Sequence, residues 1–188
     1  MIIKLIESFS YDAQIEDIKK KIRTVPDFPK PGIMFRDITT LLKDKEGIRK
    51  VVDVFYNRYK GMKIDIVAGI ESRGFILGGI LAEKLDAGFV PIRKKGKLPA
   101  EIERQDYLLE YGIDSIEIHK DAIQPGQTVL IIDDLIASGG TALAACNLVD
   151  KLGGVIEEVA FIVNLPELGG KEKLSRWKTF SIVDFEGK

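Results

Sequence analysis

The chain has 188 residues, of which 45% are hydrophobic and 30% are charged. This length and this balance fit one globular domain and leave no room for a second full domain. The chain has 28 Lys and Arg residues and 29 Asp and Glu residues, so its net charge is −1. No general positive field therefore indicates a nucleic-acid partner. A single cysteine excludes an internal disulfide framework.

The hydropathy pattern excludes two further classes. The apolar start of the chain is short and is interrupted by Lys4, so it does not read as a targeting signal. No apolar run approaches the ~18 residues that span a bilayer. We therefore expect a cytoplasmic protein that binds neither membranes nor nucleic acid.

The first sixty residues predict two helices with a proline-rich turn between them. Apolar residues at every third or fourth position from Ile15 to Ile22 predict an amphipathic helix with Asp12 as its N-cap. Three prolines then forbid regular helix across residues 25–32. A second amphipathic helix is expected over residues 47–59.

From residue 64 onward, short apolar runs alternate with helical segments. The expected strands are residues 64–70, 88–92, 129–132 and 159–163, and the expected helices are residues 78–85 and 141–152. Runs that are apolar throughout suit strands covered on both faces, and strand–helix alternation produces parallel sheets. The predicted fold class is therefore α/β, with a central parallel sheet flanked by helices.

A polar insertion over residues 93–112 interrupts this alternation. It begins with four basic residues within residues 93–98 and continues as a mixed polar stretch. An insertion of this length inside a compact domain is usually a working loop or a short hairpin. The basic cluster alone is also compatible with a solvated surface loop.

Residues 129–141 carry the most informative pattern. Four apolar residues predict a buried strand, Asp133 and Asp134 follow at its carboxyl end, and a loop of small residues leads into a helix. Ligands of open α/β sheets bind beyond the carboxyl ends of strands, and amides at a helix N-terminus bind phosphate. The two carboxylates can accept hydrogen bonds from sugar hydroxyls or hold a divalent cation. Two acids before a glycine turn can also be an ordinary strand end, but the order of all three features favours a binding site.

Four further motifs accompany this pattern along the chain. They are residues 28–38, 71–75, 93–99 and 109–112. Together the five segments resemble the adenine phosphoribosyltransferases of the type I phosphoribosyltransferase family, from about Ile15 onward. The resemblance implies one type I phosphoribosyltransferase-like domain over residues 1–188. Within it, about residues 1–36 would form a small N-terminal hood and base-binding segment, and about residues 93–112 a flexible catalytic loop.

The resemblance also implies a reaction. Adenine and phosphoribosyl diphosphate (PRPP) would give AMP and diphosphate, through a state that resembles a ribosyl oxocarbenium ion, in a homodimer. The cofactor would be Mg²⁺ carried by PRPP, without a direct protein ligand and with a water bridge to Asp133 or Asp134. These two carboxylates would face the ribose hydroxyls and the developing positive charge.

The remaining site residues follow from the same resemblance. The 5′-phosphate would be held by Ala137, Ser138, Gly139, Gly140 and Thr141. The diphosphate would be held by Ser72, Arg73, Arg93, Lys94 and Lys97, with Arg93 crossing a dimer interface and with the Ser72–Arg73 peptide often cis in the family. Adenine would be bound by Met34, Phe35, Arg36 and Leu165, of which the Phe and Leu side chains would cover the two ring faces. Glu110 would be the general acid or base near N7 of adenine.

Two other functions stay open from the sequence. Asn164 stands where many members of the family carry glutamate, beside Leu165, which leaves room for another purine such as xanthine. A non-catalytic sensor of PRPP or purines would keep the same fold. Such regulators usually have a surface that binds nucleic acid, and the net charge of −1 argues against such a surface in this chain.

Overall fold

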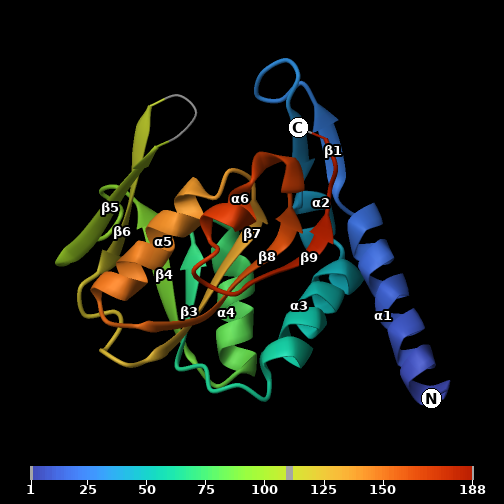
Figure 1. Cartoon of the computed structure of the whole chain (residues 1–188), viewed down its shortest axis with the longest axis horizontal. Helices are drawn as coiled ribbons and strands as arrows, with labels where there is room; N and C mark the ends of the chain where they lie inside the picture. The colour runs from blue at the N-terminus through green and yellow to red at the C-terminus, as the bar shows by residue number, and fades with distance from the viewer. Residues whose placement is uncertain (1, 109–111, 188) are drawn as a thin grey trace.

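The computed structural model describes residues 2–108 and 112–187, with side chains from residue 11 onward within these ranges. Within them, a seven-stranded sheet has the spatial order β5-β6-β4-β3-β7-β8-β9 (Figure 1). Its strands are β3 (Ile66–Ile70), β4 (Gly88–Lys94), β5 (Ile102–Leu108), β6 (Ile113–His119), β7 (Thr128–Ile136), β8 (Val155–Asn164) and β9 (Thr179–Asp184). The helices of the described residues are α1 (Ile2–Lys20), α2 (Thr39–Leu42), α3 (Lys45–Tyr59), α4 (Arg73–Lys84), α5 (Gly140–Lys151), α6 (Gly170–Lys173) and the 3-10 helix η1 (Pro166–Leu168).

The sheet confirms the predicted α/β class. All pairings from β4 through β3, β7 and β8 to β9 are parallel. The polar insertion supplies β5, which pairs antiparallel with β6 in a hairpin, and β6 pairs antiparallel with β4 at the edge of the parallel part. The insertion thus contributes to a hairpin within the described residues, and its role as a working loop stays a prediction.

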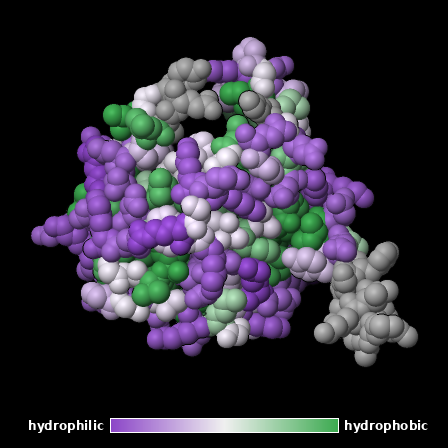
Figure 2. Space-filling view, in the orientation of Figure 1, coloured by the Kyte–Doolittle hydropathy of each residue, from purple (hydrophilic) through white to green (hydrophobic). Residues whose placement is uncertain are grey.

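Two apolar cores lie on the two faces of the sheet. Alternate residues of β7 enter different cores: Leu130 and Ile132 pack with residues of α1, α3 and α4, whereas Val129 and Ile131 pack with residues of α5. This division follows from the two-residue period of a strand. The side of the molecule drawn in Figure 2 is mostly hydrophilic, with apolar residues in small separate patches.

Two predicted helix starts are wrong. The first helix begins at Ile2 rather than at Asp12, because the intervening residues contain no proline or glycine to end it, and it ends at Lys20. Helix α4 begins at Arg73, five residues before the predicted start at residue 78. Its glycines obscure the helical pattern, and packing requires the first of them, because a Cβ on Gly74 would lie 2.6 Å from the Ile132 carbonyl oxygen.

Strands β1 (Arg23–Pro26) and β2 (Met34–Asp37) form a separate antiparallel ribbon, which we call the hood ribbon. The hood ribbon and the β5–β6 hairpin both rise at the top of Figure 1, and the C-terminus lies beside β1. The proposed division of the domain into a hood and a flexible loop stays a prediction. Among the described residues, no helix combines the length and the apolar character needed to cross a bilayer.

Candidate active site

A cavity of about 320 Å³ lies at the carboxyl ends of β3 and β7. It is lined by residues 71–73, Lys94 and residues 133–142. The cavity therefore brings together three acids, two cations and the N-terminus of α5, from segments about seventy residues apart in the chain. Ligand binding beyond the carboxyl ends of the strands is typical of open α/β sheets.

The predicted phosphate loop, residues 137–141, joins β7 to α5. Gly139 is the N-cap of α5 and adopts a left-handed conformation with φ of 76°. A Cβ on Gly139 would lie 2.6 Å from the carbonyl oxygen of Gly170, and a Cβ on Gly170 would lie 2.2 Å from the carbonyl oxygen of Ala137. The loop and the start of α6 thus touch backbone to backbone, which holds the first amides of α5 toward the cavity. The predicted site residues do not include Gly170. The sequence signal that could have identified it is the Gly169–Gly170 pair after β8.

The two carboxylates have different partners. Both lie within β7, which continues to Ile136, and both line the cavity. Asp134 is 5% exposed and accepts a hydrogen bond from Nε of Arg73. Asp133 is half-buried and accepts a hydrogen bond of 2.8 Å from the backbone N–H of Asp134. Burial and the neighbouring Asp134 carboxylate raise the pKa of Asp133 well above its ordinary value.

The predicted diphosphate loop follows β3. Its cis peptide joins Glu71 to Ser72, so the predicted position between Ser72 and Arg73 is wrong by one residue. The backbone N–H of Glu71 still donates to the carbonyl of Ile92 on β4 at 2.9 Å, and the chain therefore leaves the sheet only after Glu71. Ser72 is then the N-cap of α4, and both it and Arg73 line the cavity.

Glu71 organises the cations around this loop. Its carboxylate accepts hydrogen bonds from Nε of Arg93 at 3.2 Å and from the backbone N–H of Lys94 at 2.9 Å. Although burial acts to raise it, these hydrogen bonds hold the pKa of Glu71 below its ordinary value. The prediction of site residues did not include Glu71. The sequence signal that could have identified it is the position of an acidic residue immediately before Ser72.

Of the three basic residues predicted from the insertion, the structure brings Lys94 into the cavity lining. Lys94 Nζ donates to the hydroxyl of Tyr107 at 3.0 Å and forms an ion pair with Asp114. Arg93 and Lys97 lie beside the cavity rather than in its lining, and Arg93 donates to the Lys97 carbonyl at 3.2 Å.

Replacing Lys94 by methionine is expected to weaken the binding of inorganic diphosphate about 30-fold, because one charge-assisted hydrogen bond to an anion contributes ~2 kcal/mol. Isothermal titration calorimetry measures this directly. Lys95→Met is the matched control, since Lys95 is exposed and is not among the lining residues. Equal losses in the two variants would mean that only the net charge of the insertion matters.

The four predicted base-binding residues are all described and lie outside this cavity lining. Met34, Phe35 and Arg36 are on β2, and Leu165 directly follows β8. The Phe35 ring lies 5.9 Å from the guanidinium of Arg73, which also holds Asp134, so the hood ribbon adjoins the cavity. The Arg36 guanidinium points elsewhere and donates to the carbonyl of Glu186 at 2.7 Å.

Glu110 lies outside the described residues, but the strand that leads to it is well placed. A Cβ on Gly140 would lie 3.2 Å from the carbonyl oxygen of Leu108 and 3.4 Å from the ring of Tyr107. Strand β5 therefore packs on the phosphate loop immediately before Glu110.

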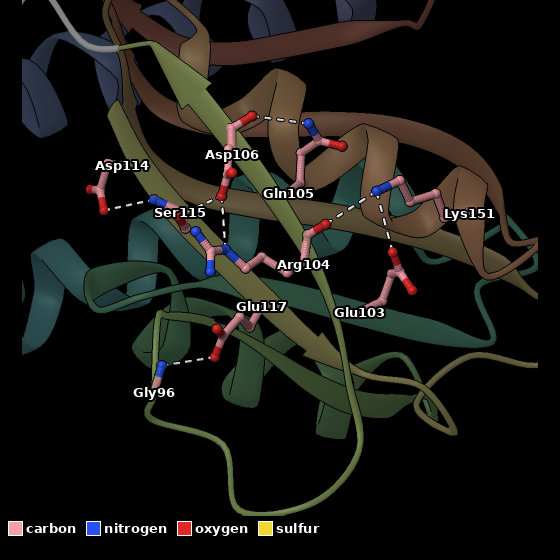
Figure 3. A network of polar contacts seen from close by, with 9 residues as sticks. All are labelled: Gly96, Glu103, Arg104, Gln105, Asp106, Asp114, Ser115, Glu117 and Lys151. Carbon is pink, nitrogen blue, oxygen red and sulfur yellow. Dashed lines mark hydrogen bonds and ion pairs between the residues drawn. The ribbon is translucent and has the colours of Figure 1, made fainter. Parts of the chain in front are cut away.

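Polar contacts hold the hairpin in this position (Figure 3). On the side toward α5, Lys151 Nζ donates to the carbonyl of Arg104 at 3.1 Å. Across the hairpin, Asp106 accepts from Ser115 Oγ at 2.6 Å. Glu117, which is 5% exposed, accepts from the backbone N–H of Gly96 at 2.8 Å and so fixes the turn of the basic cluster. The hairpin, α5 and the phosphate loop are thus one connected unit.

Comparison with known proteins agrees with this geometry. Residues 37–187 match the model of the phosphoribosyl transferase domain family. Over 172 residues, the chain is 60% identical to an adenine phosphoribosyltransferase of Methylobacillus flagellatus, a match that covers 90% of this chain and 98% of that protein. The crystal structure of adenine phosphoribosyltransferase from Thermoanaerobacter pseudethanolicus is similar with a TM-score of 0.88 and 47% identity, over 91% of this chain and 99% of that one. The Saccharomyces cerevisiae enzyme, complexed with adenine and an iminoaltritol bisphosphate, is similar with a TM-score of 0.87 and 39% identity, over 92% and 99% of the two chains.

Proposed function

Because this chain belongs to the adenine phosphoribosyltransferase family, we propose that it transfers the 5-phosphoribosyl group of PRPP to adenine and releases AMP and diphosphate. The observation that carries the proposal is the cavity in which the amides of the phosphate loop, the two adjacent carboxylates and the side chains of Arg73 and Lys94 meet. These groups match the three parts of PRPP: a phosphate, a ribose and a diphosphate.

In this proposal, Ala137, Ser138, Gly139, Gly140 and Thr141 bind the 5′-phosphate. Asp133 and Asp134 bind the ribose hydroxyls and stabilise the positive charge that develops on the sugar as the bond to diphosphate breaks. The raised pKa of Asp133 supports this role. A carboxylate whose negative charge is unfavourable in the resting site gains most from a cation that appears only in the transition state.

The leaving diphosphate gains negative charge in the same step. We assign its neutralisation to Arg73 and Lys94 in the cavity, with Ser72 at the N-terminus of α4 and with Arg93 and Lys97 beside them. Mg²⁺ would share this task. Among residues 2–108 and 112–187, no group of three or more His, Cys, Asp or Glu side chains could hold a metal. In this proposal the substrate phosphates hold the Mg²⁺, and Asp133 or Asp134, which line the cavity, reach it through water.

Adenine would lie between the hood ribbon and the residue after β8, with Phe35 and Leu165 on its two faces and with backbone groups of Met34 and Arg36 at its amino edge. Asn164, next to Leu165, donates to the Asp184 carboxylate at 2.9 Å. Its amide nitrogen is thus engaged by β9, whereas its carbonyl oxygen is buried without a hydrogen-bond partner; in this proposal backbone groups of Met34 and Arg36 select the base.

Glu110 remains the proposed general acid or base. Glu110→Ala is expected to lower kcat about 10²-fold, the lower end of the range for general acid–base catalysis, while the affinity for PRPP is retained. Steady-state kinetics with adenine, combined with calorimetric titration of PRPP, checks both parts. Full activity of the variant would remove Glu110 from the mechanism.

We also propose that the enzyme is a homodimer and that it works in the cytoplasm. An apolar surface supports the dimer: Ile76 on α4 and Phe89 on β4 are 45% and 37% exposed, and the Phe89 ring packs edge-on against Phe75. Arg93 lies 5.9 Å from the ring of Phe75 and would therefore lie at this interface. The cytoplasmic location is supported by the substrates, because PRPP and AMP are polyanions that a bilayer excludes.

Ile76→Asp is expected to convert the dimer to a monomer, because a buried unpaired carboxylate costs several kcal/mol at an interface. Sedimentation velocity at micromolar concentration measures the oligomeric state. Val155→Asp is the matched control, since Val155 is also exposed but lies at the start of β8. A monomeric wild-type protein, or dissociation by both variants, would contradict the assigned interface.

An assay of four bases tests the proposed activity itself. Adenine, hypoxanthine, guanine and xanthine are each supplied with PRPP and Mg²⁺, and nucleotide formation is followed by absorbance. AMP formation with strong preference for adenine is expected. Preference for xanthine would replace the base assignment, and binding of PRPP without turnover of any base would favour a sensor.

A further inference from the structure

We propose that the C-terminal segment, residues 184–187, positions the adenine-binding strand β2 against the residue that follows β8. This inference rests on the proposed function, since it concerns the two sides of the base site. The segment continues from β9 and ends beside the hood ribbon (Figure 1). It therefore reaches the hood ribbon directly from the edge of the sheet.

On the hood side, the segment holds Arg36. The Arg36 side chain is 8% exposed, and it donates to the carbonyl of Glu186 at 2.7 Å and to the hydroxyl of Thr24 at 2.6 Å. Its guanidinium also lies 4.7 Å from the centre of the Phe185 ring. Among the described side chains, no carboxylate forms an ion pair with Arg36. A buried guanidinium that relies on neutral acceptors and an aromatic face depends strongly on each of them.

On the sheet side, the same segment is fixed beside Leu165. The backbone N–H of Phe185 donates to the carbonyl of Asn164 at 3.0 Å, and the Asn164 side chain donates to Asp184 at 2.9 Å. One residue beyond Phe185 and Glu186, the N–H of Gly187 donates to the Glu167 carboxylate in η1 at 3.1 Å. Asn164 before Leu165 and Glu167 two residues after it are therefore hydrogen-bonded to the segment that holds Arg36.

These contacts link Phe185 to the chain neighbours of both proposed walls of the base site. Phe35 precedes Arg36 on β2, and Leu165 follows Asn164, so each wall is one residue from a group that the segment holds. A change in the segment would alter the spacing of Phe35 and Leu165, whereas the PRPP cavity has no lining residue from the segment or from β2. The segment should thus affect adenine and not PRPP. Small errors in the position of a bound reactant are costly in catalysis.

The test is a comparison of two Michaelis constants in Phe185→Ala. Loss of the aromatic face and loosening of the Glu186 carbonyl are expected to raise KM for adenine about tenfold, with kcat and KM for PRPP within about twofold of wild type. Phe185→Tyr keeps the ring and should restore KM for adenine. Glu186→Ala keeps the carbonyl and removes only an exposed side chain, so it should leave KM for adenine unchanged.

An unchanged KM for adenine in Phe185→Ala, or equal losses for adenine and PRPP, would overturn the proposal. Hydrogen–deuterium exchange separates this failure from failure of the proposed function, because it requires no turnover. If the wild-type protein makes no nucleotide, faster exchange of the β2 amides in Phe185→Ala still supports the positioning role. Unchanged exchange of these amides would refute it.

Discussion

Gly139→Ala is expected to lower the affinity for PRPP about 10³-fold, because its Cβ would collide with backbone and only movement of the phosphate loop can relieve the collision. The added carbon would lie 2.6 Å from the carbonyl oxygen of Gly170. Neither partner is the end of a flexible side chain, so either the loop or the start of α6 must shift. A displaced loop no longer directs its amides at one phosphate.

Gly126→Ala is the matched control for this variant. Gly126 has a similar φ of 84°, but a Cβ there would meet no atom within 4 Å. Both variants therefore carry the same left-handed strain, about 1 kcal/mol, and only Gly139→Ala adds the collision. Calorimetric titration of PRPP and thermal unfolding of both variants separate the two effects. Equal PRPP affinities for the two variants would show that the phosphate loop is not the binding element.

The double variant Asp133→Asn/Asp134→Asn is expected to lower kcat about 10³-fold, whereas its Kd for PRPP changes less than about tenfold. Two opposing effects on binding explain the difference. Loss of the carboxylates removes hydrogen bonds to the ribose, but it also removes two negative charges from a site that binds a polyanion. The carboxylates also stabilise the positive charge of the transition state, and no opposing effect compensates for the loss of this stabilisation. The double variant therefore lowers kcat more than it lowers the affinity for PRPP.

Asp150→Asn is the control for the double variant, because Asp150 lies near the end of α5, where it pairs with Arg176 at 3.0 Å. Its kcat should stay within about twofold of wild type. Single-turnover kinetics with saturating PRPP measures the chemical step in each variant. A double variant that loses PRPP affinity and keeps kcat would assign the two carboxylates to substrate binding alone.

Much of the central site was predictable because it is local in the chain. The buried strand, Asp133, Asp134 and the glycine loop follow one another within residues 129–141, so that a strand, its carboxyl end and a helix N-terminus are joined by the chain itself. The apolar runs of β3 and β8 were predictable for a related reason, because a strand covered on both faces has no polar alternation to confuse the pattern. The helix over residues 47–59 also formed, with Asp44 as its N-cap.

The parts that escaped prediction depend on contacts between distant segments. Gly170 supports the phosphate loop from more than thirty residues away, and its role is visible only because a Cβ on Gly170 would lie 2.2 Å from the Ala137 carbonyl oxygen. Glu71 holds Arg93 because β3 and β4 are parallel neighbours. The glycines of α4 weaken a helical pattern whose stability comes from packing against the sheet. The sequence gives no indication of where the Arg36 side chain lies, because it is held by residues 185 and 186 at the other end of the chain; the assignment of the Arg36 backbone to adenine stays a prediction.

Titration of PRPP into the wild-type protein, with and without Mg²⁺, tests the assignment of the cavity most directly. We predict saturable one-to-one binding in the presence of Mg²⁺, weaker binding without it, and loss of binding in Gly139→Ala. Absence of measurable heat in a protein that is folded by circular dichroism, with Mg²⁺ supplied, would contradict the assignment of this cavity to an activated ribose phosphate.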